Sequence, residues 1–198
     1  VSTSQAVVGA IVGWTLFTGN TTDYKVLTKI VSTWVSGPIL GMVFSALLYI
    51  LLRKTLRRTR IHVIKLDSYI RIGLIIAGGF GAYSLGANNI ANVMGVFVGS
   101  APDIMLHFGL FTLDGVQLLF LLGGLAIAVG IFTYSEKVMK TVGKGILALT
   151  PEAALVVVLA QALVLFLFSS SAFSKMLMAI GLPPMPLVPV SSTQVVVG

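Results

Sequence analysis

The 198-residue chain has no cysteine, few charges and only two histidines. The absence of cysteine excludes disulfides, thiol catalysis and metal sites built on cysteine. Charged residues make up 10% of the chain, against roughly a quarter in soluble domains, so they are too few to cover a water-facing surface. The six acidic residues are scattered and form no constellation suited to acid–base or metal catalysis. An intramembrane enzyme, such as a lipid-phosphate hydrolase, is therefore a weak interpretation, and we expect no cofactor.

Long apolar runs dominate the sequence instead. Hydrophobic residues make up 57% of the chain, and the mean hydropathy is +1.03. Uncharged runs cover residues 1–22, 30–52, 72–102, 115–135, 153–174 and 176–198. A helix needs roughly 20 residues to cross a bilayer, and these runs lack the period-two alternation of transmembrane strands. The sequence predicts an all-α, polytopic helical membrane protein.

We expect helical segments over residues 1–17, 27–52, 69–99, 112–134 and 151–171, and a further helix that starts at residues 191–193. Pro38 should bend the second segment, and the third should be a broken helix with its interruption near residues 86–89. Thr150 is the expected N-cap of the helix that starts at Pro151. The four prolines of residues 181–189 predict irregular chain. We expect the chain to be a fragment whose two ends fall within helices.

Basic residues gather in two segments. Seven of the thirteen lie within residues 53–71, and Lys137, Lys140 and Lys144 follow a later apolar run. Two predicted helices separate these segments, and the loop between those helices, residues 100–114, contains no Lys or Arg. This asymmetry predicts that the basic loops, 53–71 and 137–144, are cytoplasmic in a multi-pass plasma-membrane protein. A nucleic-acid patch is the rival interpretation, and contact with anionic lipid is compatible with either.

A polar nonapeptide occurs twice in the chain. Residues 1–9 and 190–198 are identical at six of nine positions, and two of the mismatches only exchange Ser and Thr. Such recurrence predicts two structural repeats. Hydroxyl side chains can cap the unpaired N–H groups at a helix start, and the same turn attracts anions. Two such turns facing each other would form a neutral cage for a tetrahedral anion, although they could also serve only as caps.

Three amides lie close together in the middle of an apolar run. Asn88 and Asn92 share one helical face, and Asn89 lies beside Asn88. Amide oxygens suit Na⁺, whereas the structural alternative is hydrogen bonding between helices.

The segment Gly-Ala-Asn-Asn-Ile-Ala-Asn at residues 86–92 resembles the G-A-N-D-V-A-N signature of the inorganic phosphate transporter (PiT) family. The repeated polar element, preceded in its second copy by Pro189, is similar to that family's P-V-S-T-T-H motif. The resemblance implies inverted repeats with broken helices and re-entrant hairpins, and symport of inorganic phosphate with Na⁺ or H⁺. It divides the chain into the end of a first repeat (1–52), a basic connector (53–68) and most of a second repeat (69–198).

The resemblance also implies the residues of the site. The expected phosphate-binding residues are Ser2, Thr3, Ser4, Gln5, Ser191, Ser192, Thr193 and Gln194. Asn88, Asn89 and Asn92 are expected at the cation and substrate layer, with Na⁺ at Asn88 and Asn89 and no other metal.

Two departures from the family pattern affect the chemistry. Asn89 stands where the signature has Asp, and Gln replaces the motif's His in both copies. Sulfate lacks the proton that hydrogen phosphate could donate to a carboxylate, so Asn89 leaves sulfate or another oxyanion as an alternative substrate. A channel or a non-transporting receptor of the same fold is a further alternative. The coupling ion, Na⁺ or H⁺, and a homodimeric state stay open.

Overall fold

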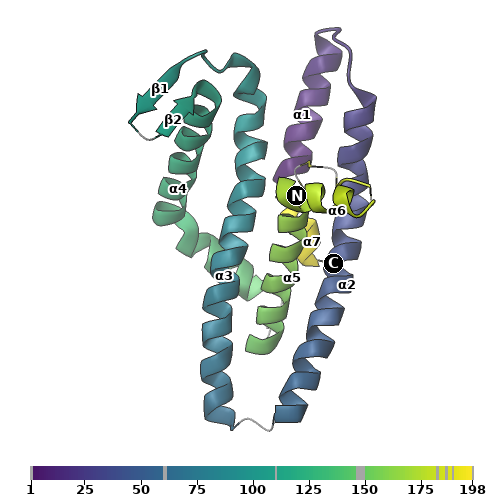
Figure 1. Ribbon diagram of the computed structural model, residues 1–198, viewed down its shortest axis with the longest axis vertical. Helices are drawn as coiled ribbons and strands as arrows, with labels where there is room; N and C mark the ends of the chain where they lie inside the picture. Colours follow the sequence, from purple (N-terminus) through teal and green to yellow (C-terminus); the bar gives the residue numbers. More distant parts are fainter. Residues whose placement is uncertain are drawn as a thin grey trace. The chain divides into compact units, whose positions relative to one another are not determined.

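The described residues form α-helices and one short β-hairpin (Figure 1). The computed structural model describes residues 2–59, 62–109, 111–145, 150–181, 183–185, 187–188 and 190–197. The helices are α1 (Thr3–Phe17), α2 (Tyr24–Thr59), α3 (Val63–Met94), α4 (Gly115–Gly145), α5 (Pro151–Ser169), α6 (Ser171–Ala179) and α7 (Ser192–Val197), with a 3-10 helix η1 (Gly95–Ser100). The strands are β1 (Met105–Phe108) and β2 (Phe111–Asp114). The chain is therefore mostly helical, as predicted.

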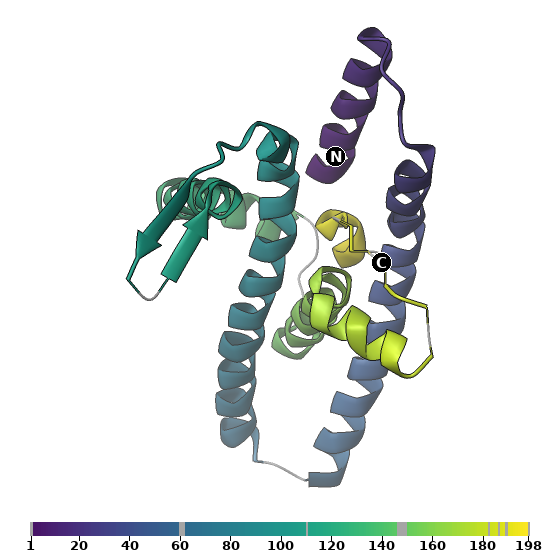
Figure 2. The ribbon, with the colours of Figure 1, turned by 45° about the horizontal axis from the view of Figure 1, so that its top comes forward.

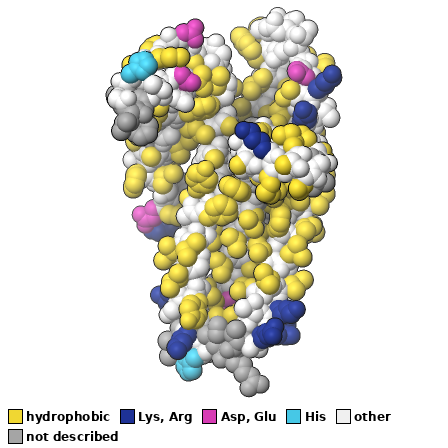
Figure 3. Space-filling view, viewed as in Figure 1, with side chains coloured by type: hydrophobic (Ala, Val, Ile, Leu, Met, Phe, Trp, Pro, Cys, Tyr) yellow, Lys and Arg dark blue, Asp and Glu magenta, His cyan; other side chains and the backbone are white. Residues whose placement is uncertain are grey.

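Four helices in these ranges are long and apolar enough to cross a membrane. They span Tyr24–Arg58, Lys65–Ser100, Gly115–Lys137 and Pro151–Ser169. Large apolar side chains are exposed along them, with Phe132 91% and Ile75 75% accessible, and hydrophobic atoms cover much of the visible surface (Figure 3). Exposing such side chains to lipid tails costs little free energy, whereas exposing them to water is unfavourable. The four helices are consistent with a multi-pass membrane protein.

The chain divides into two compact units, the first made of Val1–Asn88 and Thr150–Gly198. In this unit α5 lies between α2 and the adjoining part of α3 (Figures 1 and 2). The rings of Phe80 and Phe166 lie 5.5 Å apart between α3 and α5. Its buried core consists of Val164, Leu165, Phe168, Val190 and Val195. The unit thus joins the two ends of the chain around α5.

The second unit consists of Asn89–Leu149. Its antiparallel hairpin pairs Met105 with Asp114, in a segment that the sequence predicted only as a loop. Helix α4 then starts at Gly115, three residues later than predicted. Asp114 and Gln117 explain this start: the Gln117 N–H donates to Asp114 Oδ1 at 2.6 Å, and the Asp114 N–H donates to Gln117 Oε1 at 3.1 Å. This reciprocal capping box fixes the end of the strand and the beginning of the helix.

The predicted break near residues 86–89 is wrong. Helix α3 is continuous from Val63 to Met94, and the α-helix gives way to η1 only at Gly95. A glycine inside a helix costs roughly 1 kcal/mol, which does not by itself break the helix. The side-chain amide of Asn88 forms its hydrogen bonds with the helix intact, as described below, so the backbone does not have to unwind there.

The basic segments are also not loops where the structure describes them. Residues 53–59 continue α2, residues 63–71 belong to α3, and residues 137–145 belong to α4. Lys and Arg are good helix formers, and cations near a helix C-terminus interact favourably with its dipole. Arg60, part of the predicted connector, lies outside the described residues.

Several local predictions are confirmed. Thr150 caps α5, its Oγ1 accepting the Ala153 N–H at 3.3 Å with Pro151 in the first turn. Pro38 lies inside α2, and the bend expected at this residue stays a prediction. The described residues of 181–189 form neither helix nor strand, whereas Pro189 lies outside the description. The predicted repeat boundaries stay a prediction, because the two units are defined by contacts and not by repeat symmetry.

Candidate functional site

The polar element near the start of the chain caps helix α1. Ser2 has an extended backbone, and its Oγ accepts the Gln5 N–H at 3.4 Å. The Ser2 carbonyl accepts the Ala6 N–H at 3.1 Å. Both bonds satisfy N–H groups that a helix start would otherwise leave unpaired.

The second polar element caps α7 in the same way. Ser191 Oγ accepts the Gln194 N–H at 3.4 Å, and the Ser191 carbonyl accepts the Val195 N–H at 3.2 Å. Each of these positions corresponds to its counterpart in α1 across the nonapeptide repeat. The sequence repeat is therefore also a repeat of capping geometry.

The two capped helix starts lie next to each other. Ser4 Oγ donates to the Val190 carbonyl at 3.5 Å, across 186 residues of chain. Ser2, Ser4 and Ser191 are each no more than 5% exposed. Thr3 and Thr193 are exposed, whereas Gln5, Ser192 and Gln194 are half-buried. The structure thus brings both predicted hydroxyl-rich elements together in the first unit.

Asn88 of α3 binds the same point of the chain. Its Nδ2 donates to the Val190 carbonyl at 2.9 Å, and its Oδ1 accepts the Val190 N–H at 2.8 Å. The side chain is buried, 4% exposed, where an unpaired backbone group would be costly. Asn88 therefore holds the residue that immediately precedes the α7 cap, and its side-chain oxygen keeps one lone pair for a further contact.

Asn89 and Asn92 belong to the second unit. Asn89 is half-buried and Asn92 is buried. The structure therefore does not gather all three predicted amides in one unit with the capped helix starts.

Two glycines of α2 form the surface against which α7 packs. A Cβ at Gly41 would lie 2.6 Å from the Val195 carbonyl oxygen, and a Cβ at Gly37 would lie 3.3 Å from side-chain atoms of Val190 and Val195. The sequence contains three Gly-xxx-Gly pairs, and among the described residues only the pair Gly37 and Gly41 mediates such an approach. Gly9, Gly13, Gly95 and Gly99 have nothing within 4 Å of the Cβ position.

Four polar atoms are buried without a hydrogen-bond partner in the described part of the chain: Gln194 Oε1, Ser84 Oγ, Trp34 Nε1 and Thr22 Oγ1. Ser84 is fully buried and lies one helical turn before Asn88, on the same face of α3. Unsatisfied buried groups are rare in folded proteins and call for a ligand, a water or an ion. Sequence reasoning missed Ser84, although a serine one turn from Asn88 within an apolar run was the available signal.

The residues around the two caps carry no formal charge, so the groups that they offer are hydroxyls, amides and backbone N–H groups. Helix starts made of such groups bind anions through oriented dipoles. Across the ranges that the structure describes, no three His, Asp or Glu side chains gather as a metal site would require.

Comparisons with known proteins agree with the resemblance of the motifs. The family model described as "Phosphate transporter family" matches residues 1–198. The chain is 24% identical to a protein of Pyrococcus furiosus named "Putative phosphate permease", over 76% of this chain and 53% of that protein. It is 33% identical to the sulfate permease CysP of Bacillus subtilis, over 74% of this chain and 37% of that protein.

A third relative is the low-affinity inorganic phosphate transporter PitB of Escherichia coli. The identity is 35%, over 51% of this chain and 26% of that protein. The chain thus spans about half, or less, of the length of these relatives. No solved structure matches it.

Proposed function

Since the chain belongs to the phosphate transporter family, whose members are transporters and not enzymes, we propose that the protein containing it is a secondary active symporter of inorganic phosphate. The observation that carries this proposal is the meeting of two equally capped helix starts at Val190. The coupling ion is proposed to be Na⁺ or H⁺. Alternating access would arise from two inverted repeats, with boundaries at 1–52, 53–68 and 69–198 and with re-entrant hairpins that end at the two caps.

The proposed anion site is a neutral cage of hydrogen-bond donors. In the described part of the chain the hydroxyls of Thr3 and Ser192 are not engaged in any hydrogen bond, so they are available to a ligand. Helix dipoles add attraction for an anion without a fixed positive charge. A site without Lys or Arg holds a dianion more weakly than an ion-paired site would, which favours the release that transport requires.

Gln194 supports phosphate as the substrate. Its Oε1 is buried and has no donor among the described residues. Hydrogen phosphate carries a hydroxyl that can donate to this oxygen, whereas sulfate at neutral pH carries none. An acceptor left unsatisfied by sulfate would cost the site about 1–3 kcal/mol of binding free energy.

Sulfate is the second candidate, on two observations. The chain is 33% identical to the sulfate permease of Bacillus subtilis, and Asn89 stands where the family signature has a carboxylate that could accept the phosphate proton. We propose Asn88, Asn89 and Asn92 as members of the cation and substrate layer, with the other repeat's signature completing the coupling site.

The decisive test is transport by the full-length protein that contains this chain. Ser192→Ala and Thr193→Ala should raise the KM for labelled phosphate about tenfold, since one hydrogen bond to a charged group contributes about 1.5 kcal/mol or more. Ser32→Ala is the matched control, because Ser32 is exposed on α2 and donates only to the Lys29 carbonyl. An unchanged KM at normal membrane expression would remove the α7 cap from the substrate site.

The same assay separates the substrates and the coupling ions. Uptake of labelled phosphate should be inhibited more strongly by unlabelled phosphate than by sulfate, and uptake should require either a Na⁺ or a H⁺ gradient. Stronger inhibition by sulfate would make the protein a sulfate permease. Uptake that neither saturates nor depends on a gradient would indicate a channel.

A further inference from the structure

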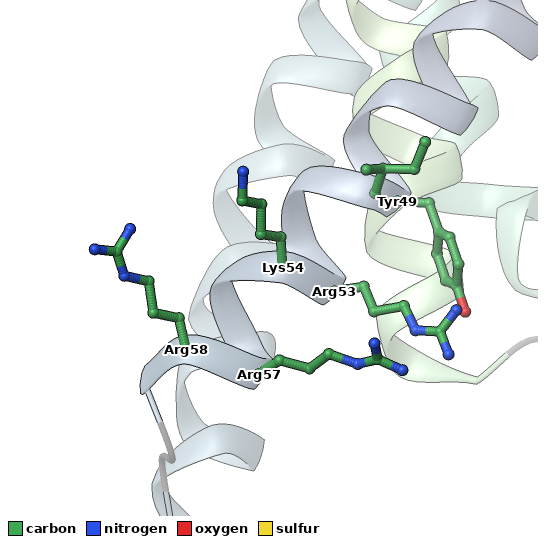
Figure 4. Close-up of a pocket in the computed structure, with 6 residues that line it drawn as sticks. Tyr49, Arg53, Lys54, Arg57 and Arg58 are labelled. Carbon is green, nitrogen blue, oxygen red and sulfur yellow. The ribbon is translucent and has the colours of Figure 1, made fainter.

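The last two turns of α2 carry four cationic side chains. Arg53 and Arg57 lie one turn apart, as do Lys54 and Arg58. Figure 4 shows that the side chains of Arg53 and Arg57 extend to one side of the helix together with Tyr49, whereas those of Lys54 and Arg58 extend to the other side. All four cations line one open cavity of about 530 Å³ together with Tyr49 and Ile50 (Figure 4), and of the four only Arg53 and Arg57 also line the cavity beside α5.

These cations have no anionic partner within 4 Å in the described residues. Elsewhere the chain does pair its charges, Arg71 with Asp67 at 2.8 Å and Lys140 with Glu136 at 2.5 Å. Like charges one helical turn apart repel each other. An external anion would relieve that repulsion at the end of α2.

A cavity of about 320 Å³ adjoins the Arg53 and Arg57 pair. Its lining is Tyr49, Leu52, Arg53, Leu56, Arg57, Thr150 and Glu152. It therefore combines two guanidinium groups with leucine side chains and the first turn of α5. A cavity of this kind suits a ligand that is anionic at one end and apolar at the other.

The cavity also lies at the end of an apolar run long enough to cross a membrane. The apolar run of residues 30–52 ends immediately before Arg53, and exposed Leu47, Ile50 and Leu51 precede the basic turns. An apolar helix face next to unpaired arginines matches an acyl chain next to a phosphate. A soluble anion would gain nothing from Leu52 and Leu56.

We propose that Arg53, Arg57 and Tyr49 bind the phosphodiester of an anionic phospholipid. Arginine forks bind phosphate oxygens in a bidentate manner, which a lysine cannot reproduce. Glu152 also lines the cavity and repels an anion, so the headgroup must offer a donor to its carboxylate. Phosphatidylglycerol, whose headgroup ends in hydroxyls, meets this condition. The site is separate from the caps at Val190 and does not depend on the transported anion.

The test is native mass spectrometry of the full-length protein in detergent, titrated with phosphatidylglycerol and with phosphatidylcholine. Arg53→Gln combined with Arg57→Gln should weaken phosphatidylglycerol binding about thirtyfold, because the bidentate contacts to the phosphodiester are lost. The matched control, Lys54→Gln with Arg58→Gln, removes the same charge without a bidentate contact and should weaken binding less than about threefold. Phosphatidylcholine binding should not change in either variant.

Equal weakening by both double variants would mean a diffuse electrostatic effect and would overturn the proposal. So would displacement of the lipid by millimolar glycerol phosphate, which would make a soluble anion the ligand. If the double Gln variant does not fold, Arg53→Lys with Arg57→Lys keeps the charge and removes the forks. Full retention of phosphatidylglycerol by that variant would exclude the bidentate site, and loss of binding would support it.

Discussion

At the scale of single residues, the most informative contact is the one between Asn88 and the backbone of Val190. The sequence predicted that the amides of residues 86–92 carry a special role and that Ser2 and Ser191 lie at helix starts, because local patterns encode both. It did not predict the partner of Asn88, which lies 102 residues away. Long-range pairing of a side chain with a backbone leaves no periodic trace in the sequence.

Replacing Asn88 with Leu should test this contact at nearly constant volume. Both hydrogen bonds would be lost, which leaves the buried N–H of Val190 unpaired and its carbonyl with Ser4 Oγ as its remaining donor. We expect a loss of about 3 kcal/mol in stability, measured as a lower midpoint of thermal unfolding in detergent. Asn20→Leu is the control, since Asn20 lies in an exposed loop and its side chain donates to Thr18 Oγ1; an equal effect at both positions would contradict the role of Asn88.

At the scale of elements, helix ends and contacts between helices decide where the caps are placed. The apolar runs predicted most of the helices, because the length of such a run indicates a helix whatever that helix packs against. They did not predict the β-hairpin, because strands of four residues are too short to show a pattern. The runs also did not show that α2, α3 and α4 extend into the basic segments. Basic residues end an apolar run, but they do not end a helix, because Lys and Arg have high helical propensity.

Gly41→Ala tests whether the stability of the fold depends on the close approach of α7 to α2. The added Cβ would meet the Val195 carbonyl oxygen at 2.6 Å, so α7 would have to move away from α2. We expect a loss of about 2 kcal/mol in stability, together with a higher KM for the transported anion.

Gly13→Ala is the matched change on α1, where a Cβ would have nothing within 4 Å. This variant should be neutral or gain up to about 1 kcal/mol in stability. Similar losses in both glycine variants would show that α7 does not depend on the approach at Gly41.

At the scale of the whole molecule, charge sets the expected orientation in the membrane. Dark-blue basic side chains gather near the lower ends of α2 and α3 in Figure 3, around the connection between these helices. His62 lies at that connection and His107 lies on strand β1. One membrane-length span, Lys65–Ser100, separates the two histidines, so they should face opposite sides.

Because this chain has no cysteine, single cysteines can report this orientation. In intact cells, a membrane-impermeant maleimide should label the His107→Cys variant and spare the His62→Cys variant, since basic segments face the cytoplasm. Both positions are exposed, so both should react after the membrane is permeabilised. Labelling of residue 62 from outside would reverse the proposed orientation.

The two hydrogen bonds between Asn88 and Val190 also limit which substitutions each of these positions can accept. Any residue except proline supplies the same N–H and carbonyl at position 190, so its hydrogen bonds survive most replacements there. What limits position 190 is bulk, since a Val190 methyl lies 3.3 Å from where a Cβ of Gly37 would be. Position 88 is limited by chemistry, because the side chain there must both donate and accept at one fixed reach. The two residues of one contact are thus constrained in different ways, position 190 in size and position 88 in polarity and reach.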